Sequence, residues 1–224
     1  MKEKKDNTDS FDFEYNLILL GDSSVGKTCF FKKLTSGIFK EINVSTIGID
    51  RRTFDLKCDL EEQEGKVTSK IVKVNITDTA GQERYKALTK SYYKNSDAAL
   101  ILYDITEEKT YENIDSWIDS INESINTDKE KYTMFLLGTK IDLVTSGKKE
   151  REVNKEDAES KCKENKLEWG GEISNKECTE EEFKEKVAGF IKIIYKKNGD
   201  KKEKQNSLDI AKFKKKEKKR QGCC

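Results

Sequence analysis

Short apolar runs, each about the length of a strand, recur along the chain. Three of them are continuous, which is typical of strands buried on both faces of a sheet: 15–21, 98–105 and 132–138. Residues 69–77 alternate apolar and polar side chains, as a half-buried strand does, and strands are also expected at 51–60 and, more weakly, at 167–173. The charged residues 61–68 would then form the loop of a hairpin.

Helices are predicted between these strands. Apolar residues recur at helical spacing in three segments, 28–37, 110–125 and 181–195, and a polar helix is expected at 154–166. Gly37 is placed to end the first helix. Strands that alternate with helices predict an α/β fold, in which a mainly parallel sheet has helices on both faces.

Charge separates the body of the chain from its tail. Charged residues make up 39% of the sequence and hydrophobic residues 34%, so the core is modest. The net charge is +1, but residues 198–224 contain ten Lys/Arg and four Asp/Glu and carry +6, which leaves −5 on the remainder. Hydrophobic periodicity also ends at about residue 196. We therefore expect a polar N-terminal extension at 1–13, one domain at 14–196 and a flexible basic tail at 197–224.

Several classes of protein are disfavoured by the composition. No apolar run approaches the ~20 residues that span a bilayer, and the polar N-terminus lacks the apolar segment of a secretory signal, so a cytoplasmic location is expected. Four cysteines are scattered without a CxxC pair, which speaks against zinc. The sequence has no histidine, so Ser-His and Cys-His nucleophiles are excluded. Lys, Thr, Asp, Gln and backbone amides suit phosphate chemistry.

Residues 21–28, GDSSVGKT, match the phosphate-binding pattern G-x-x-x-x-G-K-[ST]. The match follows a predicted strand and opens a predicted helix, as the pattern requires. Backbone N–H groups of such a turn, together with the positive end of the helix, bind phosphate oxygens. Lys27 is expected to contact the outer phosphates, and the Thr28 hydroxyl to bind Mg²⁺. The alternative is a chance glycine turn followed by a capping threonine.

A second cluster, ITDTAGQERY, places Asp78 at the end of a predicted strand, where an acidic residue can hold the Mg²⁺ shell through water. Gly81 lets the backbone approach the terminal phosphate, and Gln82 can orient an attacking water. Here the chain resembles a Ras-superfamily small GTPase, over most of residues 15–195. The resemblance implies the small GTPase fold of P-loop NTPases with a six-stranded sheet. It also implies that Thr46, in VSTIGID, ligates Mg²⁺ and that Phe39 packs on guanine.

The resemblance extends to the loop that binds the base. Where the family has Asn-Lys-x-Asp, this chain has Thr139-Lys140-Ile141-Asp142. Asp142 would accept hydrogen bonds from guanine that adenine cannot donate, and Lys140 would lie over the ring. The family's Asn touches guanine N7 and steadies the phosphate loop, whereas Thr139 offers only a hydroxyl. We therefore expect faster nucleotide release than from a Thr139→Asn variant.

A second base loop, Ser174-Asn175-Lys176, resembles the family's Ser-Ala-Lys, in which the middle residue contributes its backbone N–H. The residues expected to bind GTP or GDP are Ser23, Ser24, Val25, Gly26, Lys27, Thr28, Cys29, Phe39, Thr46, Gly81, Thr139, Lys140, Asp142, Ser174, Asn175 and Lys176.

Within the superfamily the chain most resembles a Rab, on the stretches STIGID, DTAGQERY, SYYKNSDAALILYDIT and the terminal CC. The resemblance implies effector-facing positions at Ile47, Arg51, Thr77 and Tyr92. Rabs usually carry Phe and Trp where Arg51 and Thr77 stand, so two aromatic anchors of the usual effector surface are absent. The loop 61–68 is also longer than the usual family hairpin. It is either a tolerated surface insertion or a contact specific to one branch.

The tail sequence KFKKKEKKRQGCC is open to three interpretations: a solvated charge run, a nucleic-acid-binding arm or a lipid anchor. Stacking on nucleic acid needs aromatic residues, and Phe213 alone is present, so no nucleic-acid partner is expected. Cys223 and Cys224 resemble Rab prenylation sites, where two lipid chains give stable anchoring. Nearby basic residues would add attraction to anionic membranes.

These features predict a Rab-like GTP/GDP switch that hydrolyses GTP and recruits effectors to membranes in vesicle trafficking. The expected cofactor is Mg²⁺. The expected partners are an exchange factor, a GTPase-activating protein, prenylation escort and GDP-dissociation-inhibitor-type proteins, and effectors. Hydrolysis without the activating protein should be slow. The protein would cycle between the cytoplasm and the cytosolic face of an intracellular membrane. The alternatives are a GTP-binding scaffold with little hydrolysis and another P-loop enzyme, such as a nucleotide kinase.

Overall fold

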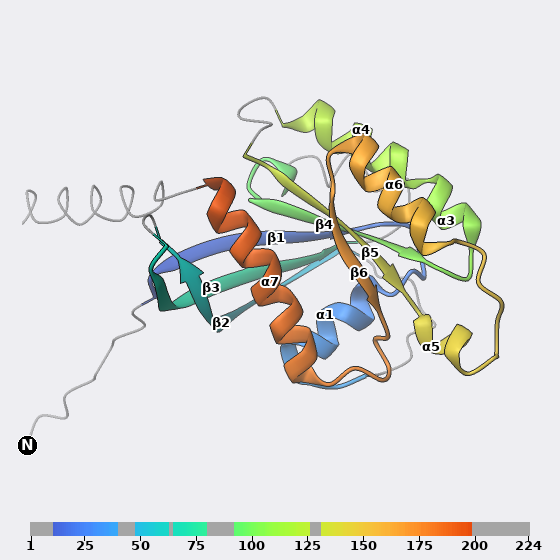
Figure 1. Ribbon diagram of the computed structural model, residues 1–224, viewed down its shortest axis with the longest axis horizontal. Helices are drawn as coiled ribbons and strands as arrows, with labels where there is room; N and C mark the ends of the chain where they lie inside the picture. Colours follow the sequence, from blue (N-terminus) through green and yellow to red (C-terminus); the bar gives the residue numbers. More distant parts are fainter. Residues whose placement is uncertain (1–10, 40–47, 63–64, 80–91, 126–130, 199–224) are drawn as a thin grey trace, which may run out of the picture.

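The computed structural model describes residues 11–39, 48–62, 65–79, 92–125 and 131–198 (Figure 1). Within them six strands form one sheet in the order β2-β3-β1-β4-β5-β6. The strands are β1 (Phe13–Leu20), β2 (Ile49–Glu61), β3 (Val67–Thr79), β4 (Ala98–Asp104), β5 (Thr133–Thr139) and β6 (Glu168–Ile173). β2 pairs antiparallel with β3, and every other neighbouring pair is parallel. The predicted six-stranded, mainly parallel sheet is confirmed.

Helices cover both faces of this sheet, also as predicted (Figure 1). The labelled helices are α1 (Lys27–Ser36), α3 (Glu108–Glu112), α4 (Ile114–Ser124), α5 (Ile141–Thr145), α6 (Lys155–Asn165) and α7 (Glu180–Asn198). Apolar residues of α1 and α7 join one core cluster, in which the rings of Phe30 and Phe183 lie 5.0 Å apart. On the opposite face, α4 and α6 contribute Trp117 and Cys162 to a second cluster.

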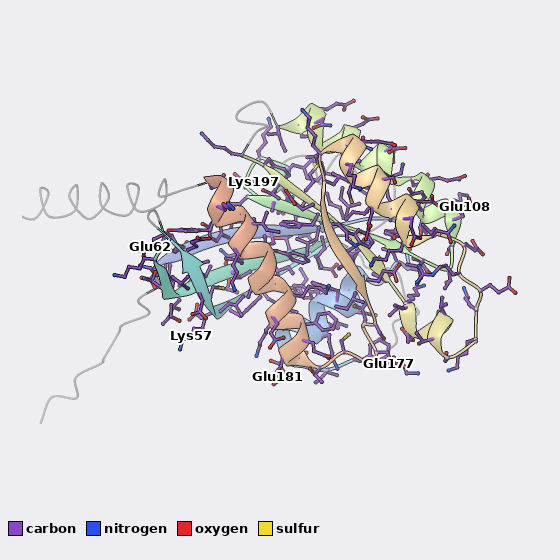
Figure 2. All side chains as sticks on the ribbon, in the orientation of Figure 1. Lys57, Glu62, Glu108, Glu177, Glu181 and Lys197 are labelled. Carbon is purple, nitrogen blue, oxygen red and sulfur yellow. The ribbon has the colours of Figure 1, made fainter. Side chains whose placement is uncertain are left out.

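Strand β4 explains why the sheet has two cores. All seven of its residues are buried, and alternate side chains enter opposite clusters: Leu100 joins the α1–α7 side and Ile101 the α4–α6 side. A continuous apolar run is what a central parallel strand requires, because helices cover it above and below. Charged side chains lie at the periphery instead, with Lys57 and Glu62 on the β2–β3 side and Glu108 on the α3 side (Figure 2).

Several element boundaries differ from the predicted ones. The helix expected at 110–125 is divided at Asn113 into α3 and α4, and the short helix α5 was not predicted. Helix α7 spans Glu180–Asn198 and so extends beyond both ends of the predicted helix 181–195. Among the described residues, no helix has both the length and the apolar character needed to cross a membrane.

The predicted hairpin loop at 61–68 is too long. β2 continues to Glu61 and β3 begins at Val67, because backbone pairing persists where these two paired side chains are exposed. The Glu62 N–H donates to the Lys66 carbonyl at 2.8 Å, and the Glu62 carboxylate accepts from Thr68 and pairs with Lys70. The hydrophobic pattern missed these ends of the strands because Glu61, Val67 and Thr68 are not buried, although Leu60, which pairs with Thr68, is.

Candidate functional site

Five parallel strand ends converge on one edge of the sheet, and the predicted nucleotide-binding residues follow them. β1 leads into the loop 21–26, β3 ends beside Asp78, and β5 ends at Thr139. β4 ends at Asp104, and Ser174 directly follows β6. Ligands of open α/β sheets bind at the carboxyl ends of the strands, so this edge is the candidate site.

The loop between β1 and α1 closes around the side chain of Lys27. Lys27 is 4% exposed, and its Nζ donates to the carbonyl oxygens of Gly21 at 2.8 Å and Asp22 at 2.6 Å. Burial lowers the pKa of Lys27 to about 8, although Asp78 and Asp22 favour its charged form. The ammonium is therefore held on the inner side of the loop, where a point charge can attract phosphate oxygens.

Two glycines allow the loop to pack this closely. A Cβ at Gly21, where φ is 130°, would collide with the carbonyl oxygen of Leu102. Gly26 has a φ of 99° and stands at the N-terminal end of α1. Of the other predicted residues here, Ser23 and Ser24 are exposed, Val25 is buried, and Thr28 and Cys29 are half-buried. The loop thus combines a helix N-terminus with the backbone turn expected of a phosphate site.

Asp78 brings a buried carboxylate to the same edge. Its side chain is 1% exposed, and neither carboxylate oxygen has a hydrogen-bond partner among the described residues. Burial raises the pKa of Asp78 to about 6, and the nearby Thr28 hydroxyl and Lys27 ammonium partly offset this rise. Buried polar atoms are nearly always paired in folded proteins. Unpaired hard oxygens beside a hydroxyl suit a hard cation such as Mg²⁺.

Thr139 links the end of β5 to the phosphate loop. It is fully buried, and its hydroxyl lies 2.7 Å from the Val25 carbonyl oxygen and 2.8 Å from that of Tyr103. A hydroxyl has one proton to donate, so these two carbonyls share it. Thr139 therefore contacts the phosphate loop directly, although it is shorter than the asparagine usual in the family.

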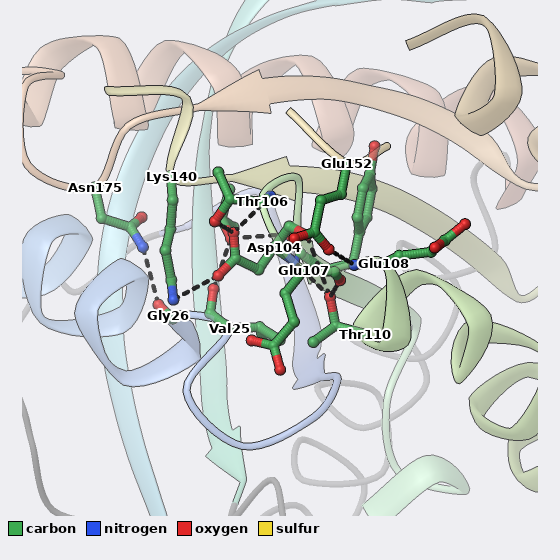
Figure 3. Close-up of polar contacts among 12 residues, drawn as sticks. Val25, Gly26, Asp104, Thr106, Glu107, Glu108, Thr110, Lys140, Glu152 and Asn175 are labelled. Atoms are coloured by element: carbon green, nitrogen blue, oxygen red, sulfur yellow. Dashed lines mark hydrogen bonds and ion pairs between the residues drawn. The ribbon is translucent and has the colours of Figure 1, made fainter. Parts of the chain in front are cut away.

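Lys140 follows in a left-handed conformation, with φ of 65°. Its Nζ is 2.6 Å from the carboxylate of Asp104, which is fully buried and also accepts from the backbone N–H and hydroxyl of Thr106 (Figure 3). Left-handed conformations of non-glycine residues are strained, and such strain clusters at functional sites. The ion pair holds the Lys140 stem extended across the site.

The second base loop is tied to the first. The Ser174 hydroxyl donates to the Asp142 carboxylate at 2.8 Å and accepts the N–H groups of Lys176 and Glu177. Asn175 is 6% exposed, and its amide Nδ2 donates to the Gly26 carbonyl at 3.0 Å (Figure 3). The structure thus brings together the predicted residues of the phosphate loop and of both base loops. Lys176 itself is exposed.

Some predicted site residues cannot be placed or lie elsewhere. Thr46, Ile47, Gly81, Gln82, Cys223 and Cys224 are outside the described residues. Phe39 is half-buried after α1. Of the effector-facing set, Arg51 and Thr77 are direct neighbours across β2 and β3, and Tyr92 is 40% exposed. Thr77 is only 9% exposed, whereas Arg51 is exposed and donates to the Asn16 side chain at 2.8 Å.

Sequence reasoning missed a contact that holds the phosphate loop from α3 and α4. The Asp22 carboxylate accepts from Asn113 Nδ2 at 2.6 Å and from the Trp117 indole N–H at 2.9 Å. It also missed the ion pair of Asp104 with Lys140. Asp104 does carry a signal, since it is the first charged residue after an apolar strand, at the edge where ligands bind. Trp117 carries none, because its helical spacing indicates only a core position.

Comparison with known proteins identifies the family. A model of the Ras family matches residues 16–196. The Ras-related protein Rab-13 of Rattus norvegicus is 38% identical over 158 residues, which cover 70% of this chain and 70% of that protein. The chain belongs to the Ras family, as a Rab-type small GTPase. The Ras-related protein Rab-8A of Bos taurus is 37% identical over 150 residues, 67% of this chain and 65% of that protein.

As a Rab-type GTPase, the chain is a GTP/GDP switch of vesicle trafficking that hydrolyses GTP to GDP and phosphate. The predicted family, fold and reaction are confirmed. The alternative of a scaffold with little hydrolysis is not favoured by these relatives, and another class of P-loop enzyme is excluded by the family match.

Proposed function

We propose that the edge formed by the ends of β1, β3 and β5 is the GTP site of this Rab-type GTPase. The observation that carries the assignment is the buried carboxylate of Asp78, which has no hydrogen-bond partner within the described ranges, beside the buried ammonium of Lys27. Two buried ionisable groups with strongly perturbed pKa values, at the carboxyl ends of parallel strands, are typical of a site built for a charged ligand. Asp78, acting through water, and the Thr28 hydroxyl would hold Mg²⁺. Bound Mg²⁺ would offset charge on the phosphates.

The phosphate loop would bind the nucleotide before any chemistry occurs. The unbonded N–H groups at the start of α1, which Gly26 precedes, would bind phosphate oxygens, and Lys27 would supply the positive charge. Water would attack the γ-phosphorus in line with the leaving GDP oxygen, and Gln82 would orient that water. Thr46 would complete the metal site. Both residues lie outside the described ranges, so their roles stay predictions from the family resemblance.

Guanine would be selected by Asp142, whose carboxylate is positioned by Ser174. A carboxylate accepts from the N1–H and amino groups of guanine, whereas adenine leaves it unpaired, and an unpaired charge in a closed site is costly. Lys140, extended toward Asp104, would lie along one face of the base and Phe39 would pack on guanine as well. Thr139, Asn175 and Lys176 would complete the base loops.

Regulators and a membrane are proposed as partners. An activating protein would accelerate hydrolysis, an exchange factor would release GDP, and effectors would bind the GTP form. Prenylation of Cys223 and Cys224, with the help of an escort protein, would let the basic tail anchor the chain to an intracellular membrane. A GDP-dissociation-inhibitor-type protein would return it to the cytosol. Arg51 in place of an aromatic residue makes the surface around β2 and β3 more polar than the usual effector surface.

Nucleotide content and phosphate release test the proposal together. The purified chain should carry GDP or GTP, and Gln82→Leu should release phosphate at least about tenfold more slowly in a single turnover, as expected when one positioning contact is lost. Gln63→Leu, the same change between β2 and β3, is the matched control and should hydrolyse at the wild-type rate. Co-purified ATP, or equal release by wild type and Gln82→Leu, would contradict the proposal. A mass shift at the C-terminus would test prenylation of the tail.

A further inference from the structure

The side chain of Asn175 makes a contact that its family counterpart cannot make. The middle residue of Ser-Ala-Lys has no polar side chain, whereas here Asn175 Nδ2 donates to the Gly26 carbonyl at 3.0 Å. The approach is close, since a Cβ on Gly26 would lie 2.6 Å from Nδ2. The two residues are 149 positions apart, so the bond joins the second base loop to the phosphate loop (Figure 3).

The orientation of this amide is determined by its partner. A carbonyl oxygen only accepts hydrogen bonds, so Asn175 must present its nitrogen to Gly26. Its Oδ1 is then turned away, and it is buried with no hydrogen-bond partner among the described residues. A buried acceptor without a partner is costly. An alanine would avoid that cost, so the amide is expected to serve a purpose other than stability.

Thr139 makes the matching contact on the neighbouring residue. Its hydroxyl lies 2.7 Å from the Val25 carbonyl, so two loops hold two consecutive carbonyls of the phosphate loop. Because a peptide group is planar, its C=O and the next N–H point in opposite directions. The Gly26 carbonyl also accepts the Phe30 N–H of α1 at 2.9 Å, so Asn175 adds a second donor to it. With both carbonyls held, the N–H groups of Gly26 and Lys27 face the other side of the loop, where phosphate would bind.

We propose that Asn175 is a positioning residue for nucleotide binding, which replaces the amide that this chain lacks at Thr139. The amide is supplied from the second base loop instead of the first, and it acts on Gly26. The proposal rests on the nucleotide site described under the proposed function. It predicts that Asn175 slows nucleotide release by fixing the phosphate loop and that it has little role in the stability of the chain.

Release of fluorescently labelled GDP from the full chain in Mg²⁺ tests this role. Asn175→Ala removes one neutral hydrogen bond and should accelerate release by about two- to tenfold. Asn175→Asp keeps the size but turns an oxygen toward the Gly26 carbonyl, so the acceleration should be larger. Combining Thr139→Asn with Asn175→Ala restores the family pattern, and this double variant should release GDP within about twofold of wild type.

Asn165→Ala is the matched control, because Asn165 Nδ2 also donates to a backbone carbonyl, that of Lys161, at 3.1 Å within α6. Asn165→Ala should leave the rate of GDP release unchanged. The unfolding temperature of Asn175→Ala should be lowered no more than that of Asn165→Ala. The role of Asn175 would be overturned, but not the nucleotide site, if both Asn175 variants released GDP at the wild-type rate. The same would hold if Asn165→Ala accelerated release as much as Asn175→Ala does. A wild-type chain that fails to bind labelled GDP would instead overturn the proposed site itself.

Discussion

Replacing Asp78 with asparagine is predicted to change stability in opposite directions with and without Mg²⁺ and nucleotide. Asp78 is 1% exposed, and both its carboxylate oxygens lack hydrogen-bond partners among the described residues. Burial is the main reason that its pKa rises to about 6, against the opposing effects of Thr28 and Lys27. The ionised form is therefore costly in the folded chain. Asparagine has nearly the same shape and carries no charge.

The rise in pKa sets the size of this cost. The ordinary carboxyl value of 3.8 becomes about 6 in the folded chain. Since one pKa unit corresponds to ~1.4 kcal/mol, ionised Asp78 lowers the free energy of unfolding by about 3 kcal/mol at neutral pH. The buried amide of the variant costs about 1–3 kcal/mol if it stays unpaired. The expected net gain for the metal-free variant is therefore about 1 kcal/mol.

The pH dependence separates these two contributions. The folded chain binds the Asp78 proton more tightly than the unfolded chain. The stability that Asp78 contributes is therefore greatest below pH 3.8, and it is lost as pH rises through about 6. Asparagine does not titrate. The stability advantage of the variant should therefore shrink by about 1.4 kcal/mol between about pH 7.5 and about pH 5. Urea unfolding of nucleotide-free chain in a metal chelator measures it at each pH.

Excess Mg²⁺ and GDP should reverse the order of stabilities. Binding to the folded state alone stabilises by RT ln(1 + [L]/Kd), and the variant loses a metal contact, so wild type should gain more. Asp59→Asn, the same change at an exposed position of β2, is the control and should follow wild type in both conditions. If the Asp78 variant shows no pH-dependent difference, or gains as much from Mg²⁺ and GDP as wild type, the assignment of Asp78 to the metal site is wrong.

Three further outcomes follow from individual contacts. Trp117→Phe removes the indole N–H that binds the Asp22 carboxylate and should lower the free energy of unfolding by at least about 1.5 kcal/mol in urea titration; a loss under ~0.5 kcal/mol would refute this. Thr139→Val should release labelled GDP about two- to tenfold faster than wild type, and Thr139→Asn more slowly; the reverse order would contradict the role of the hydroxyl. Burial raises the pKa of Cys58 and Cys162 from 9.0 to about 11, so the stability that their protonated thiols give should be lost as pH rises through that range. Unfolding curves measured at alkaline pH check this, and a free energy of unfolding that does not change over the range would contradict it.

The elements that could be predicted from sequence are those whose cause is local. The apolar run at 98–105 contains β4, whose seven residues are all buried. A continuous apolar run is by itself enough to predict a strand that helices cover on both faces. Gly37 ends α1 in a left-handed conformation, with its N–H bonded to the Lys33 carbonyl, as the sequence indicates. The loop 21–28 is equally local, since the pattern of glycines and Lys27 specifies the turn.

The contacts that could not be predicted join segments far apart in the chain. Trp117 reaches Asp22 across 95 positions and Thr139 reaches Val25 across 114. Their partners are backbone carbonyls or a carboxylate whose positions depend on the register of the whole sheet. Helical spacing identifies Trp117 as buried, but no local pattern states which polar atom its N–H will meet. The family resemblance does not supply Asn175 either, because the family's residue has no side-chain amide.

Among the described residues, three of the buried polar atoms without a hydrogen-bond partner belong to the candidate site: both Asp78 oxygens and the Asn175 oxygen. Others, such as the hydroxyls of Ser120 and Thr133, lie away from it. Each costs free energy that a well-packed core would avoid. Natural sequences tolerate such conflicts at functional sites and compensate elsewhere, here in the two apolar clusters on either side of the sheet. Because a cation beside Asp78 would remove part of this cost, binding and stability should be coupled. A switch needs that coupling, since the ligand can favour one form of the chain only by the difference in free energy that it makes.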